Sequence, residues 1–278
     1  MSTGPFASSY ETVTLLGVIN QFQSLAALNY NIILGSTLNS KHSVNASIAP
    51  TKIPTIKYVG YGNGGSYNVD DGNLSQPYKP AATNMDLYRK IPFRTVPVNL
   101  DLTPEERANY RLRTLETNQY GDNYYCYWLK PIIFIDNQVR TTLVNPQTNT
   151  QEAYQLLPAN LNPTAVRLST TDVVNANASR IVVAVAGSVH ILGSEVMEYV
   201  NAFLDGDPRR AKIDEIGCYS GEERIVTGTN YQGVSFEYTD AVYVQLAKHK
   251  CTIGEDFSNP NKDYTEDIVF ENGSIILS

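Results

Sequence analysis

A glycine-rich segment carries the most recognisable chemical pattern in this sequence. Residues 60–65, Gly-Tyr-Gly-Asn-Gly-Gly, form a GxGxxG motif after a predicted strand over residues 55–61. In a dinucleotide site the motif must open a helix, because the free N–H groups at the helix start hold the pyrophosphate. Here residues 66–72 form a poor helix and place Asp70 and Asp71 near the phosphate position. The pattern therefore predicts a glycine loop and no cofactor.

Metal-ligating residue types are present, but their spacing predicts no metal site. Calcium needs about six to eight oxygen ligands in an ordered spacing, which the segment with Asp70, Asp71 and Asn73 does not provide. Zinc prefers cysteine and histidine, and only His249 and Cys251 lie close together, without a second pair. These two residues alternate onto one face of a predicted strand. We interpret them as a core thiol beside a half-buried imidazole.

No group of residues indicates catalysis. Ser188 and His190 are two residues apart but lack a G-x-S-x-G turn and a third partner. Carboxylate pairs for glycoside hydrolysis meet in space rather than in sequence, so a glycan hydrolase stays a minor alternative. The adjacent acidic pairs have structural interpretations: helix capping for Glu105 and Glu106, and solvated turn or strand-end charges for Asp214, Glu215, Glu222 and Glu223. We predict that the protein is not an enzyme.

Tyrosine is the unusual residue type, with 19 Tyr against 8 Phe and 1 Trp. The densest cluster is Tyr-Tyr-Cys-Tyr-Trp at residues 124–128, which a strand would divide between two faces. Tyrosine combines a large contact area with a polar group and is enriched where proteins meet other molecules. The predicted partner contacts are Tyr61, Tyr67, Tyr78, Tyr125 and Tyr127. The alternative is a β-sandwich that uses tyrosine in its core and corners.

Charge and composition exclude several classes of partner. The 278 residues carry 21 basic and 28 acidic side chains, a net charge of -7 that opposes binding to nucleic acid or to an anionic membrane. The longest apolar stretch, residues 181–192, is shorter than the roughly 20 residues of a membrane span. Three scattered cysteines and an N-terminus without a basic region before an apolar one indicate synthesis in a reducing cytosol.

Helical spacing is confined to a few segments. Residues 10–34 repeat apolar side chains every three or four positions, with Gly17 as the weak point and strands over 13–19 and 30–34 as the alternative. Further helices are predicted at residues 84–90, near 103–115 and near 194–204. The strongest local signal is the start of the third helix, where Thr103, Pro104 and Glu106 form a capping box with proline at the first helical position.

Strand-forming residues dominate after residue 123. Runs of β-branched and aromatic residues predict strands at 124–129, 132–135, 139–144, 153–157, 165–168, 180–186, 212–218, 223–227, 233–238, 241–249 and 268–277. The fold class is therefore α+β, dominated by antiparallel, sandwich-like β-sheet. We predict an assembly region over residues 1–122, with a flexible arm at 1–9 and a long loop at 60–83, and a β-rich domain over residues 123–278 with one inserted helix.

The chain resembles the virion structural proteins of tailed bacteriophages. The resemblance rests on an acidic, low-cysteine chain with a small-residue arm and long Tyr/Gly/Pro loops, and on two segments. The first is Asp-Leu-Tyr-Arg-Lys-Ile-Pro-Phe at 86–93 leading to Leu-Thr-Pro-Glu-Glu-Arg-Ala-Asn-Tyr-Arg at 102–111, and the second is Lys-Ile-Asp-Glu-Ile-Gly-Cys-Tyr-Ser-Gly at 212–221.

The resemblance implies a structural subunit of a tail baseplate or an adjacent tail or neck component. Such a subunit would be assembled in the host cytoplasm into the virion, where it would contact other virion proteins and copies of itself in a symmetric assembly. It would use arms, loops and tyrosine contacts, and would need no cofactor or metal. The alternative from another class is a carbohydrate- or receptor-binding β module of a tail fibre, in which the same tyrosines stack on sugar rings.

Overall fold

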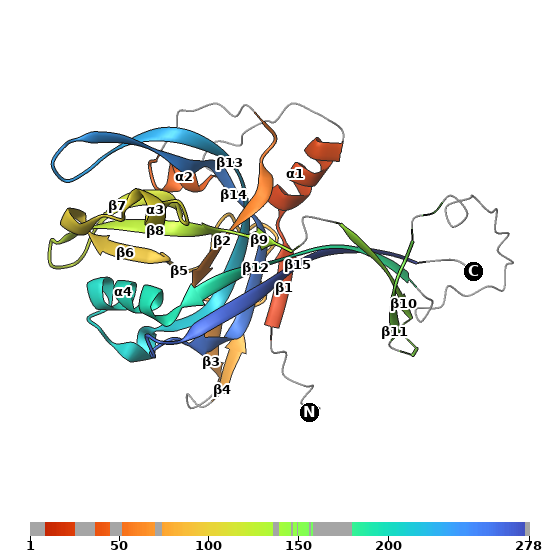
Figure 1. Ribbon diagram of the computed structural model, residues 1–278. Coiled ribbons are helices and arrows are strands. Elements are labelled where there is room, and N and C mark those ends of the chain that lie inside the picture. Colours follow the sequence, from red (N-terminus) through yellow and green to blue (C-terminus); the bar gives the residue numbers. More distant parts are fainter. Residues whose placement is uncertain are drawn as a thin grey trace, which may run out of the picture. The chain divides into compact units, whose positions relative to one another are not determined.

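The chain adopts an α+β fold dominated by antiparallel β-sheet, which confirms the predicted fold class (Figure 1). The structure is a computed structural model that describes residues 9–25, 37–44, 52–69, 74–135, 139–145, 147–148, 150–155, 157 and 180–275. Two compact units are present, one formed by residues 1–132 and 190–264 and the other by residues 133–189 and 265–278. These boundaries differ from the predicted division between residues 122 and 123.

An eight-stranded sheet forms the frame of the first unit. Its strands are β1 (Ser9–Val13), β2 (Thr55–Gly62), β5 (Lys90–Ile91), β6 (Arg94–Pro97), β7 (Arg111–Thr117), β8 (Asn123–Pro131), β13 (Lys212–Thr229) and β14 (Ser235–Asp256). The order is β1-β14-β13-β2-β8-β6, with β5 beside β2 and β7 beside β8. A separate hairpin of β3 (Ser66–Val69) and β4 (Leu74–Pro77) contacts β14.

Short helices cover this sheet. Helices α1 (Leu15–Leu25) and α2 (Leu38–Lys41) pack on β14, and α4 (Gly193–Phe203) packs on β6. The remaining helical segments are η1 (Val98–Leu100), α3 (Pro104–Arg107) and η2 (Pro208–Arg210). An apolar cluster between α2 and the central strands includes Leu38, Tyr58, Trp128, Tyr219 and Leu246. No helix in the described part of the chain has the length and apolar character needed to cross a membrane.

The second unit contains a five-stranded sheet. Its strands are β9 (Ile133–Phe134), β10 (Arg140–Asn145), β11 (Thr150–Ala153), and the parts of β12 (Arg180–Leu192) and β15 (Asp263–Ile275) that belong to this unit. The order is β11-β10-β12-β15, and β9 pairs with β12. Val183 on β12 and Val269 on β15 are exposed, and so is Val139, which precedes β10.

Several predicted strands after residue 123 correspond to longer observed strands. The prediction at 132–135 was too long, because β9 is only Ile133–Phe134, and the prediction at 153–157 overlaps β11 only at Ala153. The separate predictions at 212–218 and 223–227 merge into β13, and those at 233–238 and 241–249 merge into β14. The β13–β14 register shifts at three places, between Ile213 and Glu215, Cys218 and Tyr219, and Ser220 and Glu222. Such bulges disrupt hydrogen-bonded pairing locally without ending a strand, so turn-like sequences can lie within it. The predicted strand at 165–168 lies outside the described residues, as do residues 1–8 of the predicted arm.

Two predicted helices are shorter in the structure. Within the predicted helix at 10–34, α1 takes only Leu15–Leu25, because Ser9–Val13 pairs with β14 as β1; residues 26–34 lie outside the described part. The capping box of Thr103 and Glu106 is confirmed, but the helix near 103–115 was predicted too long, because α3 ends at Arg107. The following residues form β7, which pairs with β8 and brings Arg111 and Arg113 onto a strand. Pairing across the sheet outweighs local helix propensity here.

The prediction of a helix at 84–90 is wrong, since residues 84–89 form bends and irregular backbone and Lys90 begins β5. The backbone N–H groups of Tyr88 and Arg89 donate to the Glu215 carboxylate, 2.8 and 2.7 Å away, and so are not used within a helix. The predicted loop at 60–83 is also partly wrong, because it contains the end of β2 and the β3–β4 hairpin. Its short strands escaped prediction because they show no clear alternation of apolar residues.

His42 lies at the end of α2, with its ring stacked on Trp128 at a centroid distance of 4.9 Å. Burial lowers the pKa of His42 to about 4, with a further lowering by the charge on Lys90 and an opposing effect of Asp86. The folded chain therefore keeps this imidazole neutral at pH values where the unfolded chain protonates it. The folded state loses stability as the pH falls from 6.5 toward 4.

Replacing His42 by phenylalanine should remove this pH dependence while keeping a ring on Trp128. Relative to the His42→Phe variant, the free energy of unfolding of the wild type should fall by about 3 kcal/mol between pH 7 and pH 4. Urea unfolding of both proteins at several pH values measures the difference. Parallel pH profiles for the two proteins would contradict the assignment.

Candidate interaction site

Two neighbouring carboxylates, Asp214 and Glu215, are buried within β13. Successive residues of a regular strand point to opposite faces, but the β13–β14 register shifts between Ile213 and Glu215. A bulge of this kind changes the direction of side chains locally. Both carboxylates accept hydrogen bonds from the same segment, residues 64–66. The prediction that these acidic residues are solvated turn or strand-end charges is therefore wrong. Glu222 and Glu223 also lie within β13, and they pair with Arg224 and Arg111.

The GxGxxG segment donates its N–H groups to these carboxylates. Gly64 N lies 3.0 Å from Glu215 Oε1, and Gly65 N lies 2.7 Å from Asp214 Oδ1. The Ser66 hydroxyl donates to Asp214 Oδ2 over 2.6 Å, and the chain continues into β3 rather than into a helix. A Cβ on Gly65 would lie 2.2 Å from the Asp214 carbonyl oxygen, so glycine is required for this close approach. The donors that would bind a phosphate are occupied by the chain's own carboxylates.

Glu215 also fixes the segment before β5. Its carboxylate accepts from Tyr88 N and Arg89 N, and His249 Nε2 lies 3.3 Å from Glu215 Oε2. On the other side of the imidazole, Asn84 Nδ2 lies 3.1 Å from His249 Nδ1. One buried carboxylate thus holds together the glycine segment, the residues after Asn84 and the strand β14.

Burial affects the ionisation of the neighbouring groups. Burial raises the pKa of the Asp214 carboxyl, while the hydrogen bonds from Ser66 and Gly65 act against that rise. The Cys251 sulfur lies 3.6 Å from His249 Nε2, and burial raises the pKa of its thiol to about 12. The thiol therefore stays protonated at neutral pH and is a poor nucleophile. The prediction of a core thiol beside an imidazole is confirmed, and His249 is fully rather than half buried.

Three exposed tyrosines lie directly outside this buried network. The ring centroids of Tyr67 and Tyr78 are 4.8 Å apart, those of Tyr78 and Tyr88 are 5.8 Å apart, and Tyr88 lies 5.0 Å from His249. Their exposed fractions are 39%, 44% and 47%. We call Tyr67, Tyr78 and Tyr88 the tyrosine row. The structure brings together the predicted contacts Tyr67 and Tyr78 and adds Tyr88, which sequence analysis missed.

The other predicted contact tyrosines belong to the core. Tyr61, Tyr125 and Tyr127 are buried, so their rings cannot form an exposed contact surface on the folded chain. Tyr61 packs edge-on against Phe93 with ring centroids 4.3 Å apart. The three residues lie on inner strands of the sheet, where their rings fill the interior. The alternative interpretation, tyrosines used in the core, holds for these residues.

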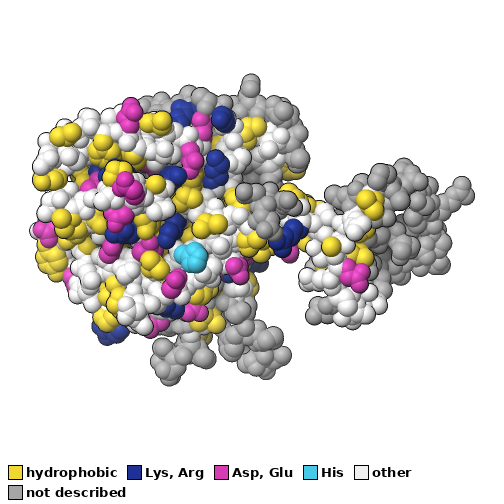
Figure 2. All heavy atoms as spheres, in the orientation of Figure 1, with side chains coloured by type: hydrophobic (Ala, Val, Ile, Leu, Met, Phe, Trp, Pro, Cys, Tyr) yellow, Lys and Arg dark blue, Asp and Glu magenta, His cyan; other side chains and the backbone are white. Residues whose placement is uncertain are grey.

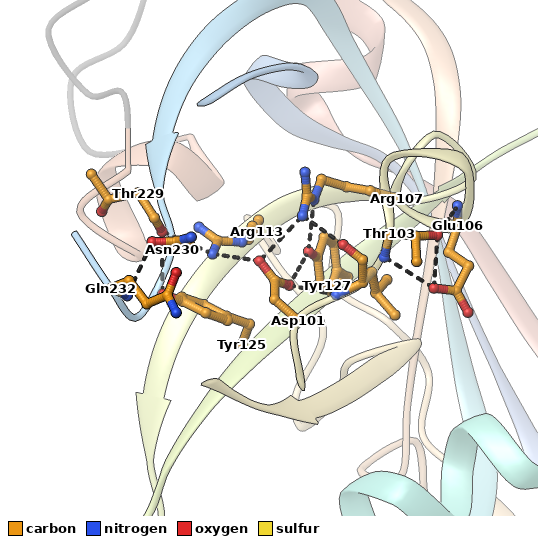
Figure 3. A network of polar contacts seen from close by, with 11 residues as sticks. Asp101, Thr103, Glu106, Arg107, Arg113, Tyr125, Tyr127, Thr229, Asn230 and Gln232 are labelled. Atoms are coloured by element: carbon orange, nitrogen blue, oxygen red, sulfur yellow. Dashed lines mark hydrogen bonds and ion pairs between the residues drawn. The ribbon is translucent and has the colours of Figure 1, made fainter. Parts of the chain in front are cut away.

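Figure 3 shows the polar network around two of these buried tyrosines, Tyr125 and Tyr127. The Tyr127 hydroxyl donates to Asp101 Oδ1 over 2.6 Å, and Asp101 also pairs with Arg113 at 2.8 Å and Arg107 at 3.3 Å. The Arg113 guanidinium lies over the Tyr125 ring, 3.5 Å from its centroid. These contacts join the segment around α3 to β7 and β8. In this network two guanidinium groups share the single carboxylate of Asp101 and link parts of the fold that are separate in the sequence.

Clefts in the described part of the chain include two that are each lined by a single carboxylate. One, of about 380 Å³, is lined by Pro208, Arg209, Lys212, Gly254, Asp256 and Ser258. Another, of about 230 Å³, is lined by Pro104, Arg107, Ala108, Arg111, Glu237, Tyr238 and Thr239. Among the residues that the structure describes, no group of three or more His, Cys, Asp and Glu side chains could hold a metal ion.

The fold and these networks define a sheet-dominated α+β protein in which buried carboxylates position surface loops. The chain belongs to the family described as "Family of unknown function (DUF7208)", which matches residues 2–273. No curated protein and no solved structure matches the chain.

Replacing Glu215 by glutamine should destabilise the fold. The amide has a single acceptor oxygen and places an NH₂ group among the N–H donors of Gly64, Tyr88 and Arg89. We expect the free energy of unfolding to fall by about 3 kcal/mol, as measured by urea unfolding. The matched control is Glu255→Gln, which removes an exposed pair with Lys262 and should cost less than about 1 kcal/mol. Equal losses in both variants would contradict the anchoring role of Glu215.

Proposed function

We propose that this chain is a structural subunit of a phage virion, in a tail baseplate or an adjacent tail or neck component. It acts through contacts with other virion proteins and copies of itself, without catalysis. The virion context is supported by the resemblance of residues 86–93, 102–111 and 212–221 to structural proteins of tailed bacteriophages. The observation that carries the assembly role is the orientation of α1.

Helix α1 turns its apolar stripe outward. Leu15, Ile19 and Phe22 follow one helical face and are exposed, with Phe22 exposed to 66%. On the inner face, Leu16 is buried together with the polar side chains of Asn20, exposed to only 7%, and Gln23. A helix on an isolated domain usually faces most of its apolar side chains to the core, so three exposed ones on the outer face support a second surface that covers the stripe in an assembly.

Two specific contacts fix this orientation. Asn20 Nδ2 donates to Ser220 Oγ over 2.6 Å, which ties the polar face to β13. A Cβ on Gly17 would lie 2.3 Å from the Ala247 carbonyl oxygen, so the helix approaches β14 as closely as glycine permits. Rotation that buries Phe22 would break the first contact and open the second. The outward stripe is therefore a consequence of the packing of α1.

A second apolar region supports the same role. The β13–β14 hairpin exposes Ile225, Tyr231 and Val234 at and near its end. In Figure 2, hydrophobic side chains reach the surface at the left edge, where Figure 1 places the end of this hairpin. Apolar side chains at the end of a long hairpin suit contact with a neighbouring subunit, because the contact removes their apolar surface from water.

Replacing Phe22 by glutamate should impair assembly without unfolding the chain. A charge on the stripe must be desolvated when a partner covers it, so incorporation into purified phage particles should fall at least about tenfold. Immunoblotting of particles assembled with the wild-type or variant chain measures incorporation. Urea stability of the purified variant should change by less than about 0.5 kcal/mol, because Phe22 is exposed.

The matched control is Leu100→Glu, which places the same charge at another exposed apolar residue, on η1. This control should be incorporated as efficiently as the wild type. Absence of the wild-type chain from purified particles would overturn the virion assignment. Normal incorporation of Phe22→Glu would overturn the role of α1.

A further inference from the structure

The tyrosine row is a surface that the proposed assembly contacts do not use. Its rings come from β3, from the residue after β4 and from the segment before β5, so three parts of the chain build one aromatic surface. Each ring keeps more than a third of its surface exposed. Contiguous exposed aromatic rings on a folded chain are characteristic of binding sites, because their exposure to water is otherwise unfavourable.

Polar groups with spare hydrogen-bonding capacity lie beside the rings. The Tyr67 hydroxyl donates to Gln76 Oε1 over 3.0 Å, and Asn84 Nδ2 donates to the Tyr88 hydroxyl over 3.1 Å. Among the described residues, the other amide atoms, Gln76 Nε2 and Asn84 Oδ1, have no partner, and neither has the Tyr78 hydroxyl. The surface therefore offers aromatic faces together with a free donor, a free acceptor and a hydroxyl.

The row is held rigidly from beneath. Tyr78 N donates to the Gly65 carbonyl over 2.8 Å, and Gly65 is itself bonded to the buried Asp214. Tyr88 N donates to the buried Glu215. Both tyrosines are thus fixed through their backbone to carboxylates in β13. A site whose rings are already positioned loses little conformational entropy on binding, which matters most for weakly bound ligands.

We propose that the tyrosine row binds a saccharide, with a pyranose ring stacked on the exposed aromatic faces. A pyranose presents apolar C–H faces and hydroxyl groups at its edge, and these match the rings and the free amide groups of Gln76 and Asn84. Stacked nucleic-acid bases are a poorer match, because the chain carries a net charge of -7 and would repel a phosphate backbone. The proposal does not depend on the assembly role of α1.

The test measures binding of defined oligosaccharides to the full-length chain. The probes are maltohexaose, cellohexaose, the hexamer of N-acetylglucosamine and hexagalacturonic acid, and saturation-transfer NMR and isothermal calorimetry follow binding. The wild type should bind at least one probe. Tyr78→Ala removes the central ring and should weaken that binding about tenfold, whereas Tyr78→Phe keeps the ring and should stay within about threefold of the wild type.

The matched control is Tyr120→Ala, which removes another exposed tyrosine, in the β7–β8 turn. It should bind like the wild type, and circular dichroism should show that all three variants are folded. Absence of binding to every probe, or equal weakening in Tyr120→Ala and Tyr78→Ala, would overturn the saccharide proposal. Loss of particle incorporation in Tyr78→Ala without any oligosaccharide binding would also overturn it and would identify the row as a protein contact.

Discussion

The burial of two adjacent carboxylates in β13 is the constraint on which the arrangement of the first unit depends. An ionised carboxylate without partners is costly in a protein interior, so Asp214 and Glu215 must be surrounded by donors. Backbone N–H groups of residues 64, 65, 88 and 89 supply most of them. This requirement explains the glycines, which let the chain come close, and the absence of a helix at 84–90. The tyrosine row lies at this place on the surface because the backbone of Tyr78 and Tyr88 is hydrogen-bonded to Gly65 and to Glu215.

Two other buried carboxylates, Asp240 and Asp86, also hold segments of the chain that are distant in the sequence. Asp240 on β14 is buried and accepts from the N–H groups of Leu112, Arg113 and Ala241, which positions the start of β7. Asp86 accepts from Tyr219 and pairs with Lys90; burial opposes its ionisation, but Lys90 and Lys41 lower the pKa of its carboxyl to about 2. Segments with few apolar side chains are thus fixed by charge and hydrogen bonds rather than by hydrophobic burial. The buried carboxylates Asp86, Asp214, Glu215 and Asp240 thus share one arrangement, in which each holds a distant part of the chain through hydrogen bonds.

Local signals in the sequence predicted the features that depend on neighbours in the chain. The capping box at Thr103 and Glu106, the helix α4 and the strand β2 all follow from residues within a few positions of one another. What sequence alone could not predict depends on distant partners. Asp214 is separated by 149 residues from Gly65, and His249 by 165 from Asn84, so their burial has no local signal. One indication of the burial of Asp214 was present in the sequence: the run Ile-Asp-Glu-Ile at 213–216 places acidic residues between apolar ones inside a predicted strand. The five predicted contact tyrosines divide for the same reason, because strand order across the sheet decides which rings are enclosed.

The stripe on α1 and the tyrosine row differ in physical character, and this difference argues for different partners. The stripe on α1 is aliphatic and aromatic without polar groups of its own, so it gains free energy mainly when another apolar surface excludes water from it. The tyrosine row carries hydroxyl groups, and the side-chain amides of Gln76 and Asn84 lie beside it. An apolar surface that covers these polar groups gives them no hydrogen-bond partner. A purely apolar partner would therefore bind the stripe and be disfavoured at the row, whereas a ligand rich in hydroxyl groups would show the opposite preference. The orientation of α1 depends on Asn20 and Gly17, and that of the row on Asp214 and Glu215, so each surface has its own internal support. A substitution on one surface can thus change its binding without altering the other.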